Sequence, residues 1–129
     1  RLVDGTTTNE VSPLRSRKSV GKEHTFDFDQ NDSEAVLARL NQLVTTVMER
    51  AQEMGVSGRL AEVKIRYTGF ETHTHGRSIP VAMDDSEVFL RLAQSLFANN
   101  LQHGEKVRLI GFRLGHLEMP LSRQITLNL

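Results

Sequence analysis

The chain has 129 residues, of which 38% are hydrophobic, and its 16 lysines and arginines balance 16 aspartates and glutamates. A chain of this length accommodates one domain with some tail, and its balanced charge means that any affinity for nucleic acid must come from the distribution of the cations. The absence of cysteine excludes disulfide and thiolate chemistry, and no apolar segment is long enough for a signal peptide or a membrane span, so we expect a cytoplasmic protein with no membrane partner.

The first 22 residues divide into a polar tail and a basic segment. Residues 1–14 show neither helical nor strand periodicity and are interpreted as a tail or linker. In Arg15 to Lys22, four of the eight residues are cationic and none is acidic, while Ser19 and Gly21 add a hydroxyl donor and an approachable backbone amide. This composition favours a phosphate contact, although a basic linker that only keeps the chain soluble explains it equally well. The charges that follow are acidic apart from His24: Glu23, Asp27, Asp29, Asp32 and Glu34.

A strand and then a long helix are predicted next. Residues 19–28 are predicted to form a half-buried strand, because His24, Phe26 and Phe28 fall on one side and polar residues on the other. Residues 32–54 are predicted to form a helix, because their apolar side chains recur at helical spacing. That apolar stripe consists of Val36, Leu37, Leu40, Leu43, Val44, Val47, Met48 and Ala51.

Both ends of this helix carry local signals. Asn31 and Glu34 have the spacing of a capping box, with asparagine in the serine or threonine place. Gly55 and Gly58 follow the last apolar residue, and glycine accepts the left-handed conformation that commonly closes a helix. The helix is therefore expected to end at these glycines.

A β-hairpin is predicted after the helix. Residues 60–67 alternate, so they form a strand with two distinct faces. One face carries Val63, Ile65 and Tyr67, and the other carries Glu62, Lys64 and Arg66. Thr68-Gly69 supplies a turn, and residues 70–79 return as the partner strand until Pro80, which cannot donate to the ladder.

A second helix and a last strand complete the predicted elements. Asp84 and Glu87 repeat the capping-box spacing, and residues 85–98 are predicted to form a helix. The apolar stripe of this helix consists of Val88, Phe89, Leu92, Ala93, Leu96 and Phe97. Residues 107–114 are rich in branched and aromatic side chains and are predicted to form a strand.

This order of elements predicts an α+β fold of βαββαβ type. The expected architecture is a four-stranded, mainly antiparallel sheet with two helices packed on one face. The other face is left open, and the alternation of side chains places Lys64, Arg66 and Arg108 on it.

Three groups of polar residues have competing explanations. His73 and His75 would share one face of a strand, but no third zinc ligand stands at a recognisable spacing, so surface polarity is the better explanation. Asp84 with Asp85 resembles a catalytic carboxylate pair, but its place at a helix start favours capping. Gly76-Arg77 suits a phosphate contact, against the alternative of a solvated arginine at a turn. With no nucleophile elbow and no glycine-rich phosphate loop, no catalytic centre is predicted.

Four segments taken together resemble a known family. They are Arg17 to Phe26, Val63 to Tyr67, Gly76 to Pro80 and Val107 to Gly111. These segments resemble the C-terminal "little finger" of Y-family translesion DNA polymerases, most closely of the bacterial DNA polymerase IV type. The basic opening is the most specific piece, since in that family it marks the junction between thumb and little finger. The resemblance implies that 1–14 are the end of the thumb with a linker, 15–118 the little finger and 119–129 a C-terminal tail.

The resemblance also implies a DNA contact that is independent of sequence. In this family the edge and the open face of the sheet grip the backbone of the template–primer duplex. The implied backbone contacts are Arg17, Lys18, Ser19, Gly21, Lys22, His75, Gly76 and Arg77. Because a histidine is only partly charged near neutral pH, the contact at position 75 is expected to be weak or pH-dependent.

The last six residues look like the bacterial sliding-clamp-binding motif. Its positions are filled by Gln124, Ile125, Leu127 and Leu129. The glutamine amide can donate and accept hydrogen bonds, and the apolar side chains can enter pockets while the backbone stays extended. Ser78, Ile79 and Pro80, expected on a loop outside the sheet, would touch the rim of the clamp as a weaker second contact. The alternative is a frayed terminus.

The function implied by the resemblance is that of a non-catalytic DNA- and clamp-binding domain of an error-prone translesion polymerase. The catalytic carboxylates of that family are missing from this chain, so Mg²⁺ would belong to the missing polymerase core and no cofactor is expected here. The expected partners are duplex DNA, the bacterial sliding clamp (β subunit) and the polymerase core. Two alternatives stay open, a free-standing α+β nucleic-acid binder and a clamp adaptor that uses only the tail.

Overall fold

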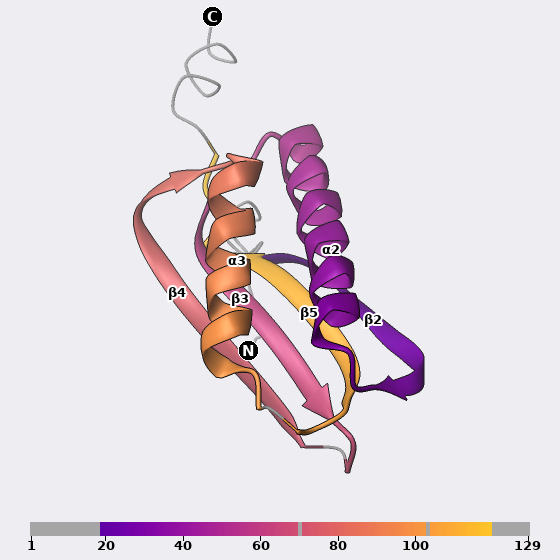
Figure 1. Cartoon of the computed structure of the whole chain (residues 1–129). Helices are drawn as coiled ribbons and strands as arrows, with labels where there is room; N and C mark the ends of the chain where they lie inside the picture. Colours follow the sequence, from indigo (N-terminus) through magenta and orange to yellow (C-terminus); the bar gives the residue numbers. More distant parts are fainter. Residues whose placement is uncertain (1–18, 70, 103, 120–129) are drawn as a thin grey trace, which may run out of the picture.

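The computed structural model describes residues 19–69, 71–102 and 104–119. Its elements follow the predicted order of strand, helix, strand, strand, helix, strand. They are β2 (Ser19–Gln30), α2 (Ser33–Met54), β3 (Gly58–Tyr67), β4 (Thr72–Met83), α3 (Ser86–Asn100) and β5 (Val107–Gly115). Figure 1 shows one sheet with both helices on the same side, so the predicted α+β fold and its open face are confirmed.

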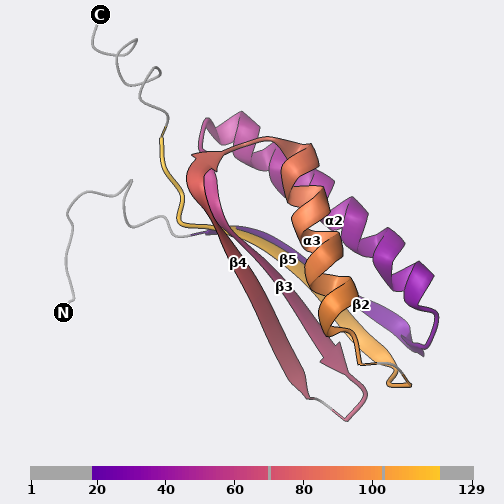
Figure 2. The ribbon, with the colours of Figure 1, turned by 60° about the vertical axis from the view of Figure 1, so that its left-hand side comes forward.

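The sheet is antiparallel throughout, in the order β2-β5-β3-β4. β3 and β5 occupy the interior of the sheet, and β2 and β4 are its two edges. Helix α2 packs over β2 and β5, and helix α3 packs over β3 and β4. The helices lie side by side in both views of the ribbon, which leaves the opposite face of the sheet uncovered by any described element (Figure 2).

The core fills the space between the sheet and the two helices. Burial of these apolar side chains is the main stabilising contribution, because full burial of each one stabilises the fold by roughly 1.5–3 kcal/mol. The largest fully buried members are Tyr67, Phe89, Leu40, Met48, Ile65, Ile110, Leu114, Val36, Val44, Val47 and Val63. The hydroxyl of Tyr67 is satisfied inside this core, since it accepts a hydrogen bond from the backbone N–H of Gln102 at 3.0 Å.

The helix starts lie one residue from the predicted caps. Asp32 rather than Asn31 is the N-cap of α2, and its Oδ1 accepts hydrogen bonds from the N–H groups of Glu34 (3.0 Å) and Ala35 (3.4 Å). Asp85 is the N-cap of α3 in the same way, accepting from the N–H of Glu87 at 2.9 Å. Both capping-box predictions were therefore wrong in register, because an aspartate next in sequence reaches the free amides of the first turn directly.

Only one of the two glycines that were predicted to end α2 does so. Gly55 closes the helix with φ 72° and ψ 31°, the left-handed conformation that glycine adopts without strain, so this prediction is confirmed. Gly58 instead begins β3, where a Cβ atom would stand 2.6 Å from Leu114 Cδ1. Gly58 is thus required by close packing and does not close the helix.

Two strands depart from the simple alternation. β4 continues past Pro80 to Met83, so the prediction that the proline ends the strand was wrong. The register shifts between Gly58 and Leu60, which pair with Met83 and Ser78, and Pro80 lies in the intervening bulged part of an edge strand where no ladder hydrogen bond is needed. In β2 a similar irregularity separates Thr25 from Gln30, and Phe28 is 83% exposed instead of half-buried.

Candidate nucleic-acid interface

The open face of the sheet is built from four transverse rows of side chains. The antiparallel register aligns one residue from each strand in every row, in the order β2, β5, β3, β4. The rows are Ser19-Gly115-Leu60-Ser78, Gly21-Arg113-Glu62-Gly76, Glu23-Gly111-Lys64-Thr74 and Thr25-Leu109-Arg66-Thr72. We call these sixteen residues the open face. Lys64 and Arg66 lie on it as the alternation predicted, whereas Arg108 is in none of the four rows, because the register shifts between Arg66 and Tyr67.

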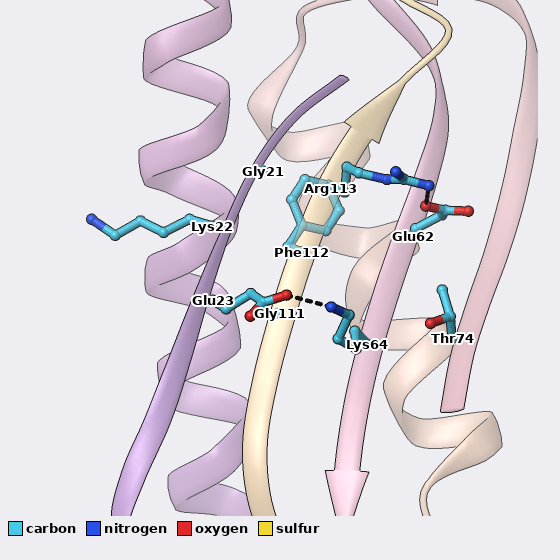
Figure 3. Close-up of a pocket in the computed structure, with 9 residues that line it drawn as sticks. All are labelled: Gly21, Lys22, Glu23, Glu62, Lys64, Thr74, Gly111, Phe112 and Arg113. Atoms are coloured by element: carbon cyan, nitrogen blue, oxygen red, sulfur yellow. Dashed lines mark hydrogen bonds and ion pairs between the residues drawn. The ribbon is translucent and has the colours of Figure 1, made fainter. Parts of the chain in front are cut away.

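Two ion pairs occupy the middle of the open face (Figure 3). Lys64 Nζ lies 2.5 Å from Glu23 Oε2, and these two residues face each other across Gly111. The neighbouring row holds the second pair, in which the Arg113 guanidinium donates to the carboxylate of Glu62. The cations of both pairs are about half exposed, 41% for Lys64 and 51% for Arg113, so both can reach a ligand in solvent.

A shallow groove of about 590 Å³ crosses the sheet at these two pairs. Its lining consists of Gly21, Lys22, Glu23, Glu62, Lys64, Thr74, Gly111, Phe112 and Arg113. Glycine opens this groove, because a Cβ atom on Gly111 would stand 3.0 Å from Glu23 Cγ and one on Gly21 would stand 3.1 Å from the Phe112 carbonyl oxygen. The backbone is therefore approachable at the centre of the open face.

A third arginine lies beside the open face at the irregular end of β2. Arg108 Nη1 lies 3.1 Å from Asp29 Oδ1. The hydrogen bond from Arg108, with a further one from the Thr68 hydroxyl, holds the pKa of the Asp29 carboxyl below its ordinary value of 3.8. Arg66 differs from the other cations of the open face, because its Nε donates to the hydroxyl of Thr72 at 3.0 Å and not to a carboxylate.

The predicted contact residues fall on both edges of the sheet. Ser19 and Gly21 of β2 and Gly76 of β4 lie on the open face, and Gly21 and Gly76 end the same row. Lys22, His75 and Arg77 lie between these positions along their strands, so they belong to the side of the sheet that carries the helices. Lys22 projects outward past the edge strand in Figure 3, beside residues of α2. The structure therefore does not bring Lys22 and Arg77 together.

Other predicted site residues lie elsewhere. Ser78 pairs with Leu60 on the open face, and Ile79 and Pro80 begin the bulged part of β4, so their expected position in a loop outside the sheet was wrong. Arg17 and Lys18 lie outside the described residues, as do Gln124, Ile125, Leu127 and Leu129.

Sequence reasoning missed several residues of the open face as site residues: Glu23, Glu62, Thr74, Gly111 and Arg113. Alternation within the last strand placed Arg108 on the open face and so did not identify Arg113 there. It could not show which residues of neighbouring strands share a row, because that depends on the register of pairing.

The histidines of β4 contact each other and a neighbouring carboxylate. His73 and His75 stack with their ring centroids 6.3 Å apart, and His73 Nε2 lies 3.5 Å from Glu71 Oε1. Within residues 19–69, 71–102 and 104–119, no group of three or more histidine, aspartate or glutamate side chains is arranged to hold a metal ion. These residues therefore do not fit a Mg²⁺ site. None of the helices in the same ranges is long and apolar enough to span a membrane.

Comparison with curated sequences gives a consistent set of relatives. Residues 17–127 match the impB/mucB/samB family C-terminal domain. DNA polymerase IV of Methanoculleus marisnigri is 36% identical over 127 residues, which cover 98% of this chain and 35% of that protein. DNA polymerase IV of Staphylococcus saprophyticus is 32% identical over 119 residues, covering 92% of this chain and 33% of that protein. The chain thus spans about a third of the length of these relatives.

Solved structures share the fold. A structure described as a complex of the beta-clamp processivity factor and the little finger domain of PolIV matches with a TM-score of 0.63 at 19% identity, over 86% of this chain and 99% of that one. DinB from Sulfolobus solfataricus matches with a TM-score of 0.68 at 15% identity, over 84% of this chain and 32% of that one. Together with the family match over residues 17–127, these likenesses confirm the resemblance to the little finger fold, and the chain belongs to the impB/mucB/samB family as its C-terminal domain.

Proposed function

We propose that this chain is the DNA-binding and sliding-clamp-binding domain of an error-prone translesion DNA polymerase of the polymerase IV type. It grips the duplex backbone and contributes no catalytic group. The observation that carries the proposal is the open face, an uncovered four-stranded surface with cations and approachable backbone at its centre. The Mg²⁺ ions of phosphoryl transfer would be held by a catalytic core outside this chain, and the expected location is the cytoplasm.

The dimensions of the sheet suit the major groove of a duplex. Three interstrand spacings of about 4.8 Å separate the two edge strands by about 14 Å. The major groove of B-DNA is about 12 Å wide, so a sheet of this width meets the phosphates on both sides of the groove with its two edges. In this arrangement Ser19 and Gly21 contact one backbone and Gly76 contacts the other from the open face. Lys22 on the first edge, and His75 and Arg77 on the second, would reach the same backbones around the edges of the sheet. Arg17 and Lys18 extend the first contact.

The open face between the edges adds cations that neutralise phosphate. Arg113, Lys64 and Arg66 come from three different rows of the open face. Contacts of this kind to phosphate position a protein without reading base sequence. The binding should therefore be independent of sequence and should weaken steeply as salt is added, because each neutralised phosphate releases a counter-ion.

A fluorescent primer–template titrated with the chain at rising salt tests the DNA part of the proposal. Arg113→Gln and Arg66→Gln should each weaken binding several-fold at low salt. Arg50→Gln, which removes an exposed cation of α2 on the opposite side of the molecule, is the matched control and should bind as the wild type does. Equal binding by the open-face variants and the control would contradict the proposed surface.

The clamp part of the proposal concerns the tail and β4. Gln124, Ile125, Leu127 and Leu129 dock as an extended peptide, and Ser78, Ile79 and Pro80 touch the clamp rim. The solved structure of a little finger of PolIV with a beta clamp supports this pairing by analogy of fold. A buried leucine is worth roughly 1.5–3 kcal/mol, so Leu127→Ala with Leu129→Ala should lower affinity by about two orders of magnitude or more. Calorimetry against purified bacterial clamp measures this effect, and undiminished binding after deletion of residues 120–129 would exclude the tail.

A further inference from the structure

The cations at the centre of the open face already have carboxylate partners within the chain. Of the three cations in the four rows, Lys64 is paired with Glu23 and Arg113 is paired with Glu62. Only Arg66 of these three donates to a neutral group, the hydroxyl of Thr72. A surface meant to attract phosphate thus carries two negative charges between its cations.

Glycines next to the two glutamates leave room for the glutamate side chains. A Cβ atom on Gly111 would stand 3.0 Å from Glu23 Cγ, and one on Gly76 would stand 3.2 Å from Glu62 Cγ. The stem of each glutamate therefore lies over a neighbouring glycine, a position that a larger residue would not leave free. Glu62 is the more enclosed of the two carboxylates, with 20% of its side chain exposed against 47% for Glu23.

We propose that Glu23 and Glu62 are internal counter-ions that limit how tightly the open face holds DNA. This inference rests on the proposed function. A phosphate that approaches Lys64 or Arg113 competes with the carboxylate for the exposed N–H groups of the cation, and it is repelled by the negative charge of that carboxylate. Because exposed ion pairs of this kind are weak and screened by salt, the exchange remains possible and the grip is reversible.

The consequence appears in the salt dependence of binding. A cation whose charge is offset by a neighbouring carboxylate neutralises a phosphate less completely, so fewer of the counter-ions condensed on the DNA are released. The wild-type domain should therefore bind DNA more weakly, and with a shallower salt slope, than its number of open-face cations alone predicts.

The test removes the negative charge of each glutamate and keeps the shape of its side chain. Glu62→Gln and Glu23→Gln each keep the length of the side chain and remove its negative charge. In titrations of a fluorescent primer–template with the full chain, each should raise affinity by about 5- to 10-fold near 0.1 M salt and steepen the slope of log K against log salt by about 0.9. The melting temperature of each variant shows whether the fold is kept, and the two sites provide independent measurements.

Glu49→Gln is the matched control, because Glu49 is an exposed residue of α2 and the substitution makes the same change in net charge. It should leave DNA binding close to that of the wild type. A gain equal to that of Glu62→Gln would show that only net charge matters, and would overturn the proposal. Unchanged or weaker binding by both open-face variants would overturn it as well, since the glutamates would then serve to position the cations.

Arg113→Gln and Lys64→Gln separate this inference from the proposed function. If they weaken binding while Glu62→Gln and Glu23→Gln do not strengthen it, the open face binds DNA and only the counter-ion role fails. If none of the four substitutions changes binding, the open face is not the DNA surface, and the proposed function fails together with the inference.

Discussion

Gly58 shows how a single missing side chain sets the packing at the start of β3. A Cβ atom at this position would lie 2.6 Å from both Cγ and Cδ1 of Leu114 and 2.9 Å from the carbonyl oxygen of Gly115. Leu114 is fully buried, so it has little room to move.

Gly58→Ala should therefore lower the free energy of unfolding by about 1–3 kcal/mol, as overpacked core substitutions do. Urea denaturation measures this as a lower midpoint at an unchanged slope. Gly76→Ala is the control and should change the midpoint little, because its added carbon would lie 3.2 Å from the flexible Glu62 side chain and at 3.4 Å or more, ordinary contact distances, from its other neighbours. Equal midpoints for Gly58→Ala and the wild type would mean that β3 and β5 can separate without cost.

The Asp29 carboxyl gives a prediction for pH. Its pKa is lowered below 3.8 chiefly by the hydrogen bond from Arg108, so the folded state favours the charged form. The associated stability is present above the ordinary pKa and is lost as the pH falls through the lower, folded value. Arg108→Ala should return the pKa of Asp29 towards 3.8.

Carbon chemical shifts of the Asp29 carboxyl, followed by NMR in an acid titration, measure this change. Arg50→Ala removes a cation from α2 and should leave the Asp29 titration where it is. A titration curve that Arg108→Ala does not move would show that the pair seen at 3.1 Å does not persist in solution.

At the scale of the elements, the sequence was most informative where periodicity is long. The helix over residues 33–54 was predicted almost to its ends, because a stripe sustained over many turns has one interpretation. The extension of β4 past Pro80 could not be predicted, because proline is excluded only from paired positions and the bulge that leaves Pro80 unpaired is a property of two strands together. The exposure of Phe28 has the same origin in the interrupted pairing of β2.

The cap of α2 gives a prediction that distinguishes two adjacent residues. Asp32→Ala removes the acceptor for two free amides of the first turn and should lower stability by about 0.5–2 kcal/mol. Asp32→Asn should retain most of that stability, since asparagine caps nearly as well. Thermal melting compares these variants with Asn31→Ala, which should melt close to the wild type. The reverse order of the two alanine variants would restore Asn31 as the cap.

At the scale of the whole molecule, the fold class was predictable and the centre of the candidate site was not. The alternation of Glu62, Lys64 and Arg66 showed that β3 has a polar face. The pairing of Glu62 with Arg113 joins residues from two strands with a helix and another strand between them in the chain, so it depends on sheet order and register. Periodicity within one strand indicates neither the order of the strands in the sheet nor their register.

The strand order also fixes when this domain can fold during synthesis. β5 is the last described strand to be made, yet it lies between β2 and β3 and pairs with both. Until it emerges from the ribosome, β2 has no partner among the described strands, and α2 has half of its sheet surface missing. Contacts of such long sequence separation also slow folding, because the loop entropy is lost before they form.

A fragment of residues 1–106 should therefore be unfolded, whereas residues 1–119 should melt cooperatively. Circular dichroism on the two fragments makes the comparison, and a cooperative melt of the shorter one would show that β3, β4 and the helices are stable by themselves. If β5 is required, an incomplete chain stays unfolded on the ribosome until this strand is released, and a folded product that carries only part of the sheet never accumulates.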